Sequence, residues 1–107
     1  MPLVRICGVP EVPEGEARRF ELDARPYAVV NLGDEGFRVV DAICSHAHYF
    51  LDEGEVDVED QTIECPKHGS TFDLNTGRPR TLPAIQPVDA FPVKVENDDV
   101  MIEVETT

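Results

Sequence analysis

A chain of 107 residues with 41% hydrophobic residues is long enough for one folded domain and too short for a second domain beside it. Its 22 acidic and 9 basic residues give a formal net charge of -13, which disfavours nucleic acid and anionic membranes as partners and favours a partner with a basic patch. No stretch approaches the roughly twenty apolar residues of a membrane span, and the N-terminus lacks the apolar run of a signal peptide, so we expect a cytoplasmic protein.

Apolar residues that alternate with polar ones predict short strands in the first forty residues. Pro13 and Gly15 precede the run 17–22, and "DARP" ends it before two helical turns could form, so we interpret this run as a strand. Residues 33–36 have the composition of a hairpin turn. The expected strands contain the runs "LVRIC" (3–7), "FELD" (20–23), "YAVVNL" (27–32) and "FRVVDAI" (37–43).

The region from about residue 42 to about residue 87 differs from its flanks, because it has fewer regular runs and contains every histidine of the chain. We expect it to be an excursion from the sheet that carries the functional site. Its acidic stretch "LDEGEVDVED" (51–60) is most simply a solvated strand with a turn around Gly54, and we assign it no chemistry.

The C-terminal segment predicts a second hairpin, with the turn at "ENDD" (96–99). Apolar residues alternate on both sides of this turn: Phe91, Val93 and Val95 before it, and Val100, Ile102 and Val104 after it. Short strands at close spacing with turns between them predict an all-β fold, an antiparallel sandwich or small barrel. We expect residues 1–107 to form a single domain.

Three cysteines, Cys7, Cys44 and Cys65, make an odd number. That number argues against a disulfide framework and for thiols that are free or metal-bound in a reducing compartment. Cys7 belongs to the alternating run 3–7, so we expect it to pack as a small buried hydrophobic residue without a redox role.

The strongest metal-ligand candidates form two pairs, Cys44 with His46 and Cys65 with His68, and each pair contains one cysteine and one histidine. Two thiolates and two imidazoles suit a tetrahedral zinc ion or an iron–sulfur cluster. A zinc finger usually groups its cysteines in one knuckle and its histidines on a helix. Two equivalent mixed loops would instead place both thiolates on one iron and both imidazoles on the other.

The pattern Cys-x-His followed by Cys-x-x-His-Gly, with the segment "ECPKHGSTFDLNTGRP" (64–79), closely resembles the Rieske iron–sulfur family. The resemblance runs from about Val4 to Val104. It implies the Rieske iron–sulfur fold, in which a small cluster-binding subdomain, here about 42–87, is inserted in a basal β domain. It also implies one [2Fe–2S] cluster with Cys44, His46, Cys65 and His68 as ligands, surrounded by Lys67, Gly69, Ser70 and Pro83.

His48 occupies a position at which the family carries varied residues, so the resemblance implies an ordinary loop histidine there. The respiratory members of the family carry two further cysteines at the positions of Tyr49 and Lys67, so their disulfide is impossible in this chain. Those members also place a serine and a tyrosine near the cluster, and this chain keeps Ser70 but has Phe72. We therefore expect a reduction potential in the lower part of the range of about -150 to +300 mV.

A Rieske oxygenase also needs a mononuclear iron held by two histidines and a carboxylate, and His48 alone is left for it. The chain therefore resembles the small ferredoxin component of bacterial aromatic-ring-hydroxylating dioxygenase systems. This resemblance implies a monomeric one-electron carrier with no catalytic site of its own. Its partners would be a flavin-dependent ferredoxin reductase and a terminal Rieske non-haem iron oxygenase, docking at the cluster end near Lys67, Arg78 and Arg80.

Two alternatives remain open from the sequence. The chain could be the small Rieske subunit of a nitrite reductase or of another oxygenase, since these resemble it at similar length. In a different class, the same four ligands could hold zinc in a non-redox interaction module.

Overall fold

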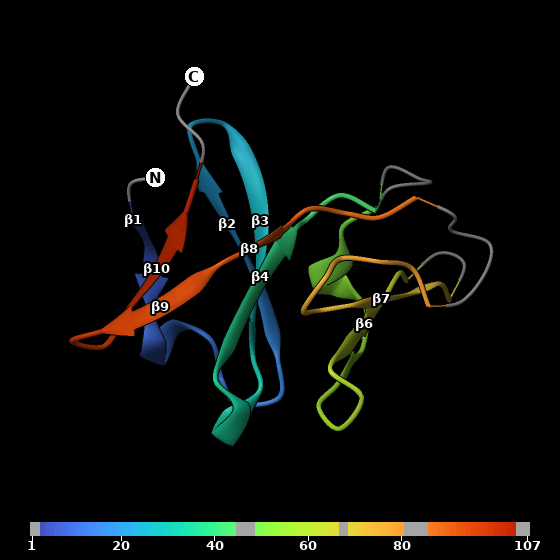
Figure 1. The fold of residues 1–107 in the computed structure, drawn as a ribbon, viewed down its shortest axis with the longest axis horizontal. Coiled ribbons are helices and arrows are strands. Elements are labelled where there is room, and N and C mark those ends of the chain that lie inside the picture. Colours follow the sequence, from blue (N-terminus) through green and yellow to red (C-terminus); the bar gives the residue numbers. More distant parts are fainter. Residues whose placement is uncertain (1–2, 45–48, 67–68, 81–85, 105–107) are drawn as a thin grey trace.

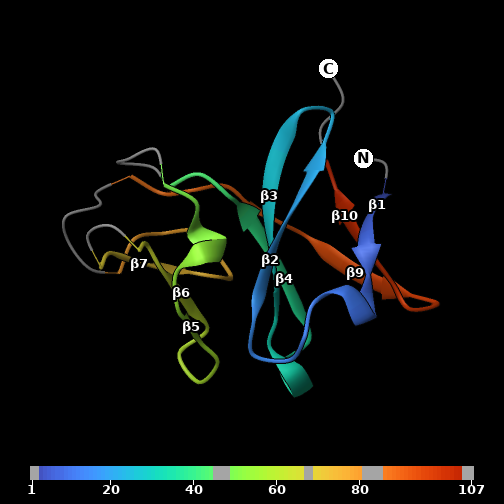
Figure 2. The ribbon, with the colours of Figure 1, turned by 180° about the vertical axis from the view of Figure 1, so that it is seen from behind.

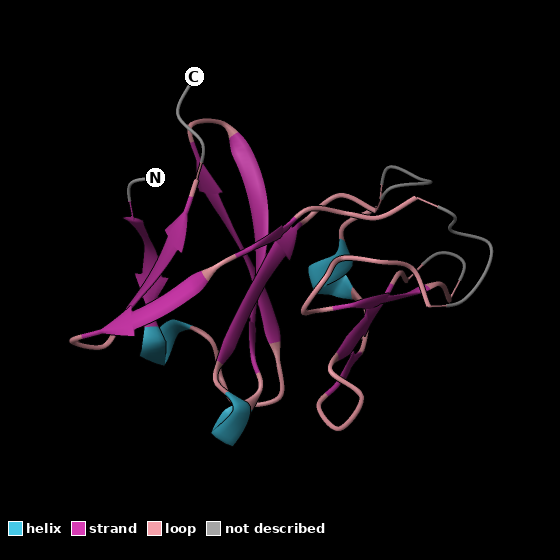
Figure 3. Ribbon diagram, in the orientation of Figure 1, coloured by secondary structure: helices cyan, strands magenta, loops and turns pink. Residues whose placement is uncertain are grey.

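The computed structural model describes residues 3–44, 49–66, 69–80 and 86–104 of the chain. The described ranges contain strands and short 3₁₀ helices, as Figure 3 shows, and this confirms the expected all-β antiparallel architecture. The strands are β1 (Leu3–Gly8), β2 (Ala17–Leu22), β3 (Arg25–Asn31), β4 (Phe37–Asp41), β5 (Val56–Asp57), β6 (Thr62–Glu64), β7 (Thr71–Asp73), β8 (Ala90–Phe91), β9 (Val93–Glu96) and β10 (Asp99–Glu103). The 3₁₀ helices are η1 (Val9–Glu11), η2 (Gly33–Glu35) and η3 (Leu51–Glu53).

The strands form three sheets that lie one beside the other, and Figures 1 and 2 show them from opposite sides. The first sheet has the order β1-β10-β9, the second β2-β3-β4-β8, and the third β5-β6-β7. The four-stranded sheet lies between the other two. The third sheet is formed by the part of the chain between β4 and β8, so the chain leaves the central sheet at the end of β4 and returns to it at β8.

The central sheet is buried on both faces, which explains the unbroken apolar run in β3. Ala28 and Val30 point toward the β5-β6-β7 sheet, whereas Tyr27 and Val29 point toward the β1-β10-β9 sheet, as the alternation of side chains along a strand requires. The two cores that result share no residue. The site-side core contains Ala17, Ala28, Val30, Leu32, Val40, Ala42, Cys44, Leu51, Ile63, Cys65, Phe72, Leu74 and Val88. The basal core contains Ile6, Cys7, Val12, Tyr27, Val29, Val39, Val100 and Ile102.

Both expected hairpins are present. Strands β3 and β4 pair antiparallel across η2, and β9 and β10 pair across Asn97 and Asp98, which adopt positive φ angles of 51° and 64°. Two successive residues with positive φ form the kind of turn that matches the twist of a hairpin, and asparagine and aspartate tolerate it well. One detail of the sequence interpretation was wrong: Val95 was expected to point inward but is 45% exposed.

The position of the hairpin in the acidic stretch also differs from expectation. The chain turns between β5 and β6, at residues 58–61, and not around Gly54. Gly54 follows η3 and lies against the backbone before Cys65, where an added Cβ atom would approach the Glu64 carbonyl oxygen to 1.6 Å. Glycine is required at position 54 because two backbone segments approach each other closely there.

Candidate metal centre

Cys44 lies just beyond the end of β4, where the chain makes its first excursion from the central sheet. Its N–H donates a hydrogen bond to the Tyr49 carbonyl oxygen at 2.9 Å, and the neighbouring residues Ile43 and Phe50 form a β-bridge. One step further, the Leu51 N–H donates to the Ala42 carbonyl oxygen at 2.7 Å. The backbone on the two sides of the loop is therefore held together as a short antiparallel ladder.

Cys65 has the same position relative to the third sheet, just after β6. Its N–H donates to the Ser70 carbonyl oxygen at 2.7 Å, and the Gly69 N–H donates to the Cys65 carbonyl oxygen at 3.0 Å. Strands β6 and β7 continue this pairing, with Glu64 opposite Thr71. In both loops, the cysteine N–H bonds the carbonyl oxygen of the fifth residue after it, so the two loops are equivalent at their bases.

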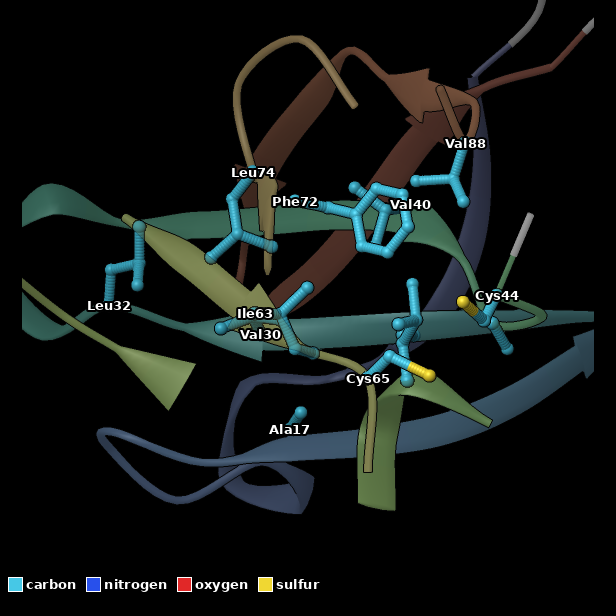
Figure 4. Packing of buried hydrophobic residues seen from close by; sticks show 13 residues of the cluster. Ala17, Val30, Leu32, Val40, Cys44, Ile63, Cys65, Phe72, Leu74 and Val88 are labelled. Atoms are coloured by element: carbon cyan, nitrogen blue, oxygen red, sulfur yellow. The ribbon is translucent and has the colours of Figure 1, made fainter. Parts of the chain in front are cut away.

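The cysteines of the two loops are both buried. Cys44 is 3% exposed and Cys65 is fully buried, and both belong to the site-side core. In the view of Figure 4 the two sulfur atoms lie on one side of this core, with Leu32 on the opposite side. A disulfide is excluded for both residues in this structure. Two buried thiols in equivalent loops suit a pair of thiolate ligands to one metal centre.

The residues that follow Cys65 set the surroundings of its loop. Ser70 and Phe72 are both fully buried, and Phe72 belongs to the site-side core, paired with Ile63 across β6 and β7. The aromatic ring at position 72 therefore packs in an apolar environment and carries no hydroxyl group. Gly69, the glycine expected near the centre, adopts a φ angle of 73°.

Cys7 belongs to a different core from Cys44 and Cys65. It is 1% exposed in the basal core, on the other face of the central sheet. Burial raises the pKa of its thiol from 9.0 to about 11, and the charge of Glu11 adds to this effect. The expectation that Cys7 packs as a small hydrophobic residue is confirmed.

Several predicted site residues lie outside the described residues, namely His46, His48, Lys67, His68 and Pro83. In the described ranges no group of three or more histidine, cysteine, aspartate or glutamate side chains is placed to hold a metal ion. Arg78 and Arg80, expected near the docking surface, are exposed, and Arg80 forms an ion pair with Asp73 at 3.7 Å. The structure thus brings Cys44 and Cys65 into one core and places Arg80 beside β7, where its N–H donates a hydrogen bond to the Thr71 carbonyl oxygen at 2.7 Å.

One contact at this site could not be predicted from the sequence. Arg19 of β2 lies over the ring of Phe50, at 3.6 Å from its guanidinium carbon to the ring centroid, and also pairs with Glu53 at 3.7 Å. The partners are 31 and 34 positions away in the sequence (50 − 19 and 53 − 19). Sequence periodicity reports local structure only, so no motif could have revealed this long-range contact.

An all-β domain that carries two buried cysteines at the bases of two equivalent loops has the architecture of a small metal-cluster electron-transfer protein. Comparison with known proteins makes the class specific. The Rieske [2Fe-2S] domain model matches residues 3–92, and the chain belongs to this family. It is a Rieske-type ferredoxin, an electron carrier and not a catalytic subunit, and its cofactor is a Rieske-type [2Fe–2S] cluster.

Known proteins resemble the chain over almost its whole length. The ferredoxin component of biphenyl 2,3-dioxygenase from Rhodococcus jostii RHA1 is 41% identical over 105 residues, which cover 98% of this chain and 95% of the relative. The ferredoxin of carbazole 1,9a-dioxygenase from Nocardioides aromaticivorans IC177 superposes with a TM-score of 0.90 at 30% identity, covering 98% and 100% of the two chains.

A third similar structure comes from a complex of reduced oxygenase and oxidised ferredoxin in carbazole 1,9a-dioxygenase. Its matching chain is 31% identical, with a TM-score of 0.82, and the match covers 96% of this chain and 97% of that one. Each of these three proteins is a component of a dioxygenase system.

No helix in the described part of the chain has both the length and the apolar character needed to cross a membrane.

Proposed function

We propose that this ferredoxin carries single electrons from a flavin-dependent ferredoxin reductase to a terminal Rieske non-haem iron oxygenase that hydroxylates aromatic rings. Full-length similarity to the ferredoxin components of dioxygenases supports this role. A similar ferredoxin in complex with its oxygenase supports the oxygenase as the electron acceptor. As part of the same proposal, the protein acts as a monomer in the cytoplasm.

The ligands of the [2Fe–2S] cluster are, in this proposal, Cys44, His46, Cys65 and His68. The observation that carries it is the equivalence of the two cysteine loops, each closed by a backbone hydrogen bond from the cysteine N–H. Both cysteines are buried and form no disulfide, which fits their use as thiolate ligands. When bound, the cluster supplies a reversible one-electron redox centre, and neutral imidazole ligands raise its potential above that of an all-cysteine cluster.

The protein itself would contribute position and environment. The two backbone ladders would fix the thiols, and the site-side core would exclude water from their sulfur atoms. Lys67, Gly69, Ser70 and Pro83 would surround the cluster. Residues of about 42–87 would form the cluster-binding subdomain, inserted in a basal β domain, with the chain 1–107 as one Rieske domain.

Metal and sulfide analysis tests the ligand assignment. Anaerobically purified protein should contain two irons and two acid-labile sulfides per chain, as the name of the cluster states, and should give a low-average-g EPR signal on reduction. Cys65→Ser should lose this signal, whereas Cys7→Ser should keep it because Cys7 lies in the basal core. A colourless wild-type protein with one zinc ion would contradict the proposal.

Reconstituted turnover tests the proposed partners. The ferredoxin should support NADH-dependent hydroxylation of an aromatic substrate when a flavin reductase and a terminal oxygenase from the same gene neighbourhood are added. Each of the three components should be required. Hydroxylation at the same rate without the ferredoxin would contradict the carrier role.

A further inference from the structure

Glu64 is the last residue of β6 and directly precedes Cys65, so it lies where the strand ends and the second cysteine loop begins. The chain on both sides holds the backbone of this residue. The Glu64 N–H donates a hydrogen bond to the Glu55 carbonyl oxygen at 2.9 Å, and Glu64 pairs with Thr71 of β7. The sheet therefore fixes the point at the base of the loop from which the Glu64 side chain extends.

The carboxylate of Glu64 lies along the outer side of this loop. Ile63 and Cys65 belong to the site-side core, so Glu64 between them points to the other face of the strand. From that face the side chain reaches Gly69, because a Cβ atom added to Gly69 would lie 3.2 Å from Glu64 Oε1. The Gly69 N–H in turn donates a hydrogen bond to the Cys65 carbonyl oxygen at 3.0 Å. The carboxylate is thus in contact with the backbone of the loop and not with the cysteine side chain.

The two residues that bring this carboxylate to the loop are the chain neighbours of two proposed cluster ligands. Cys65 follows Glu64, and His68 precedes Gly69. A charge on Glu64 therefore lies beside the loop that would supply one thiolate and one imidazole to the cluster. The inference that follows rests on the proposed function for the assignment of these two ligands.

The charge of Glu64 is not neutralised by an ion pair. The ion pairs in the described part of the chain all involve other acids. Arg80 lines a groove along the β5–β6 hairpin together with Glu64, but its guanidinium group pairs with Asp73 at 3.7 Å. Glu64 is also half-buried, so water and salt screen its charge less than they screen a fully exposed carboxylate.

A fixed negative charge near a redox centre changes the free energy of adding an electron to it. Reduction makes a [2Fe–2S] cluster more negative by one charge, so a neighbouring carboxylate disfavours the reduced state and lowers the midpoint potential. Net charge is one of the properties that set the potentials of iron–sulfur clusters, together with hydrogen bonds and solvent exposure. The position of Glu64 allows this effect without any contact with a ligand side chain.

We propose that Glu64 tunes the redox centre: the charge of its carboxylate lowers the midpoint potential of the cluster. This role requires neither ligation of the cluster nor contact with a partner protein. A lower potential makes the reduced ferredoxin a stronger electron donor to the protein that it reduces.

The test compares the midpoint potentials of three variants of the holoprotein, titrated in solution and followed by visible absorbance. Glu64→Gln removes the charge and keeps the length of the side chain, whereas Glu64→Asp keeps the charge. Glu59→Gln is the matched control, because Glu59 is an exposed acid that lines the same groove from the turn between β5 and β6. Glu64→Gln and Glu59→Gln change the net charge equally, from -13 to -12. The EPR spectrum of each reduced protein shows whether the cluster is intact.

Glu64→Gln should raise the midpoint potential. We expect the equilibrium constant for one-electron reduction to increase between about threefold and tenfold, and the tenfold limit corresponds to about 59 mV. Glu64→Asp should stay closer to wild type than to Glu64→Gln because it keeps the charge. Glu59→Gln should leave the potential almost unchanged, since its exposed charge is screened.

Three results would overturn the role of Glu64. They are an unchanged potential in Glu64→Gln, equal shifts in Glu64→Gln and Glu59→Gln, and equal shifts in Glu64→Gln and Glu64→Asp. Loss of the cluster from Glu64→Gln would overturn it as well, because the residue would then be needed to hold the cluster. A wild-type protein without the EPR signal of the cluster would contradict the proposed function instead. The measurement uses no partner protein, so the two failures are distinguishable.

Discussion

The guanidinium group of Arg19 stacks on the ring of Phe50, and this contact ties the central sheet to the segment that follows the first cysteine loop. The same guanidinium pairs with Glu53 of η3 at 3.7 Å. Phe50 in turn forms the β-bridge with Ile43, the residue before Cys44. Arg19 of β2 therefore supports the position of Cys44 through Phe50 and Ile43.

Replacing Arg19 with methionine should weaken this support. A cation–π contact at a partly exposed position contributes about 0.5–1 kcal/mol, so we expect the cluster to be lost to an iron chelator up to about fivefold faster. The decay of visible absorbance of the holoprotein measures this rate. Arg18→Met is the matched control, because the contacts of Arg18 in the described chain are local, an ion pair with Glu16 and a hydrogen bond to the Ala17 carbonyl oxygen. Equal acceleration in both variants would show that charge, and not the contact with Phe50, matters.

Replacing Gly77, in the turn after β7, should strongly destabilise the protein. It adopts a φ angle of 77°, and an added Cβ atom would lie 1.9 Å from the Val88 carbonyl oxygen. Gly36 has a similar φ of 87°, but its nearest neighbour is the mobile end of Arg38 at 3.8 Å. Gly36→Ala should cost about 1–3 kcal/mol from backbone strain alone, because its φ of 87° and ψ of -157° are adopted almost only by glycine, and Gly77→Ala should cost several kcal/mol more.

Urea unfolding of the two holoprotein variants measures this difference. The comparison isolates steric overlap from strain, since both positions have a positive φ. Similar midpoints for Gly36→Ala and Gly77→Ala would mean that the backbone near Val88 moves away at little cost.

The strands of the basal sheets could be predicted from the sequence because their pattern is local. Gly33 and Gly36 mark the turn after β3, and Asn97 and Asp98 mark the turn before β10, so pairing between neighbours in the chain follows directly. The pairing of β1 with β10 connects Leu3 to Glu103 and has no such local signal. The hairpin turn at residues 58–61 was misplaced because Gly54 is the only glycine in the acidic stretch, and its role is a close backbone approach.

Cys44 and Cys65 were predicted as ligands from their spacing to His46 and His68 and from the residues around them, and this assignment stays a prediction. The equivalence of their loops was also expected from the mixed Cys and His pairs. A groove along the β5–β6 hairpin was not expected, because the sequence interpretation treated the acidic stretch as merely solvated. Only the fold shows that four acids of this stretch line one concave surface together with Glu64: these are Glu55, Asp57, Glu59 and Asp60.

The thiol of Cys7 should make the stability of the protein fall in alkaline solution. Its pKa is raised by burial from 9.0 to about 11 in the folded state. Between these values the unfolded chain releases the proton and the folded chain keeps it, so unfolding becomes more favourable as pH rises. The effect is at most about 1.4 kcal/mol per pH unit and is absent below pH 9.

Urea unfolding at pH 8, 9 and 10 measures this dependence. Cys7→Ala should lower the free energy of unfolding at every pH because it removes buried volume. Above pH 9 it should also remove the part of the pH dependence of this free energy that comes from ionisation of the thiol. An identical slope in wild type and Cys7→Ala would show that the thiol ionises equally in both states.

Phe72 should keep the reduction potential in the lower part of the Rieske range. Its ring is fully buried two residues after Ser70 and has no hydroxyl to donate a hydrogen bond. We therefore expect Phe72→Tyr to raise the midpoint potential in protein-film voltammetry, because a donated hydrogen bond would favour the more negative, reduced state by about 1 kcal/mol. Phe91→Tyr adds the same hydroxyl at the basal core and should leave the potential unchanged. Equal shifts in both variants, or a wild-type midpoint well above about +100 mV, would contradict this role of position 72.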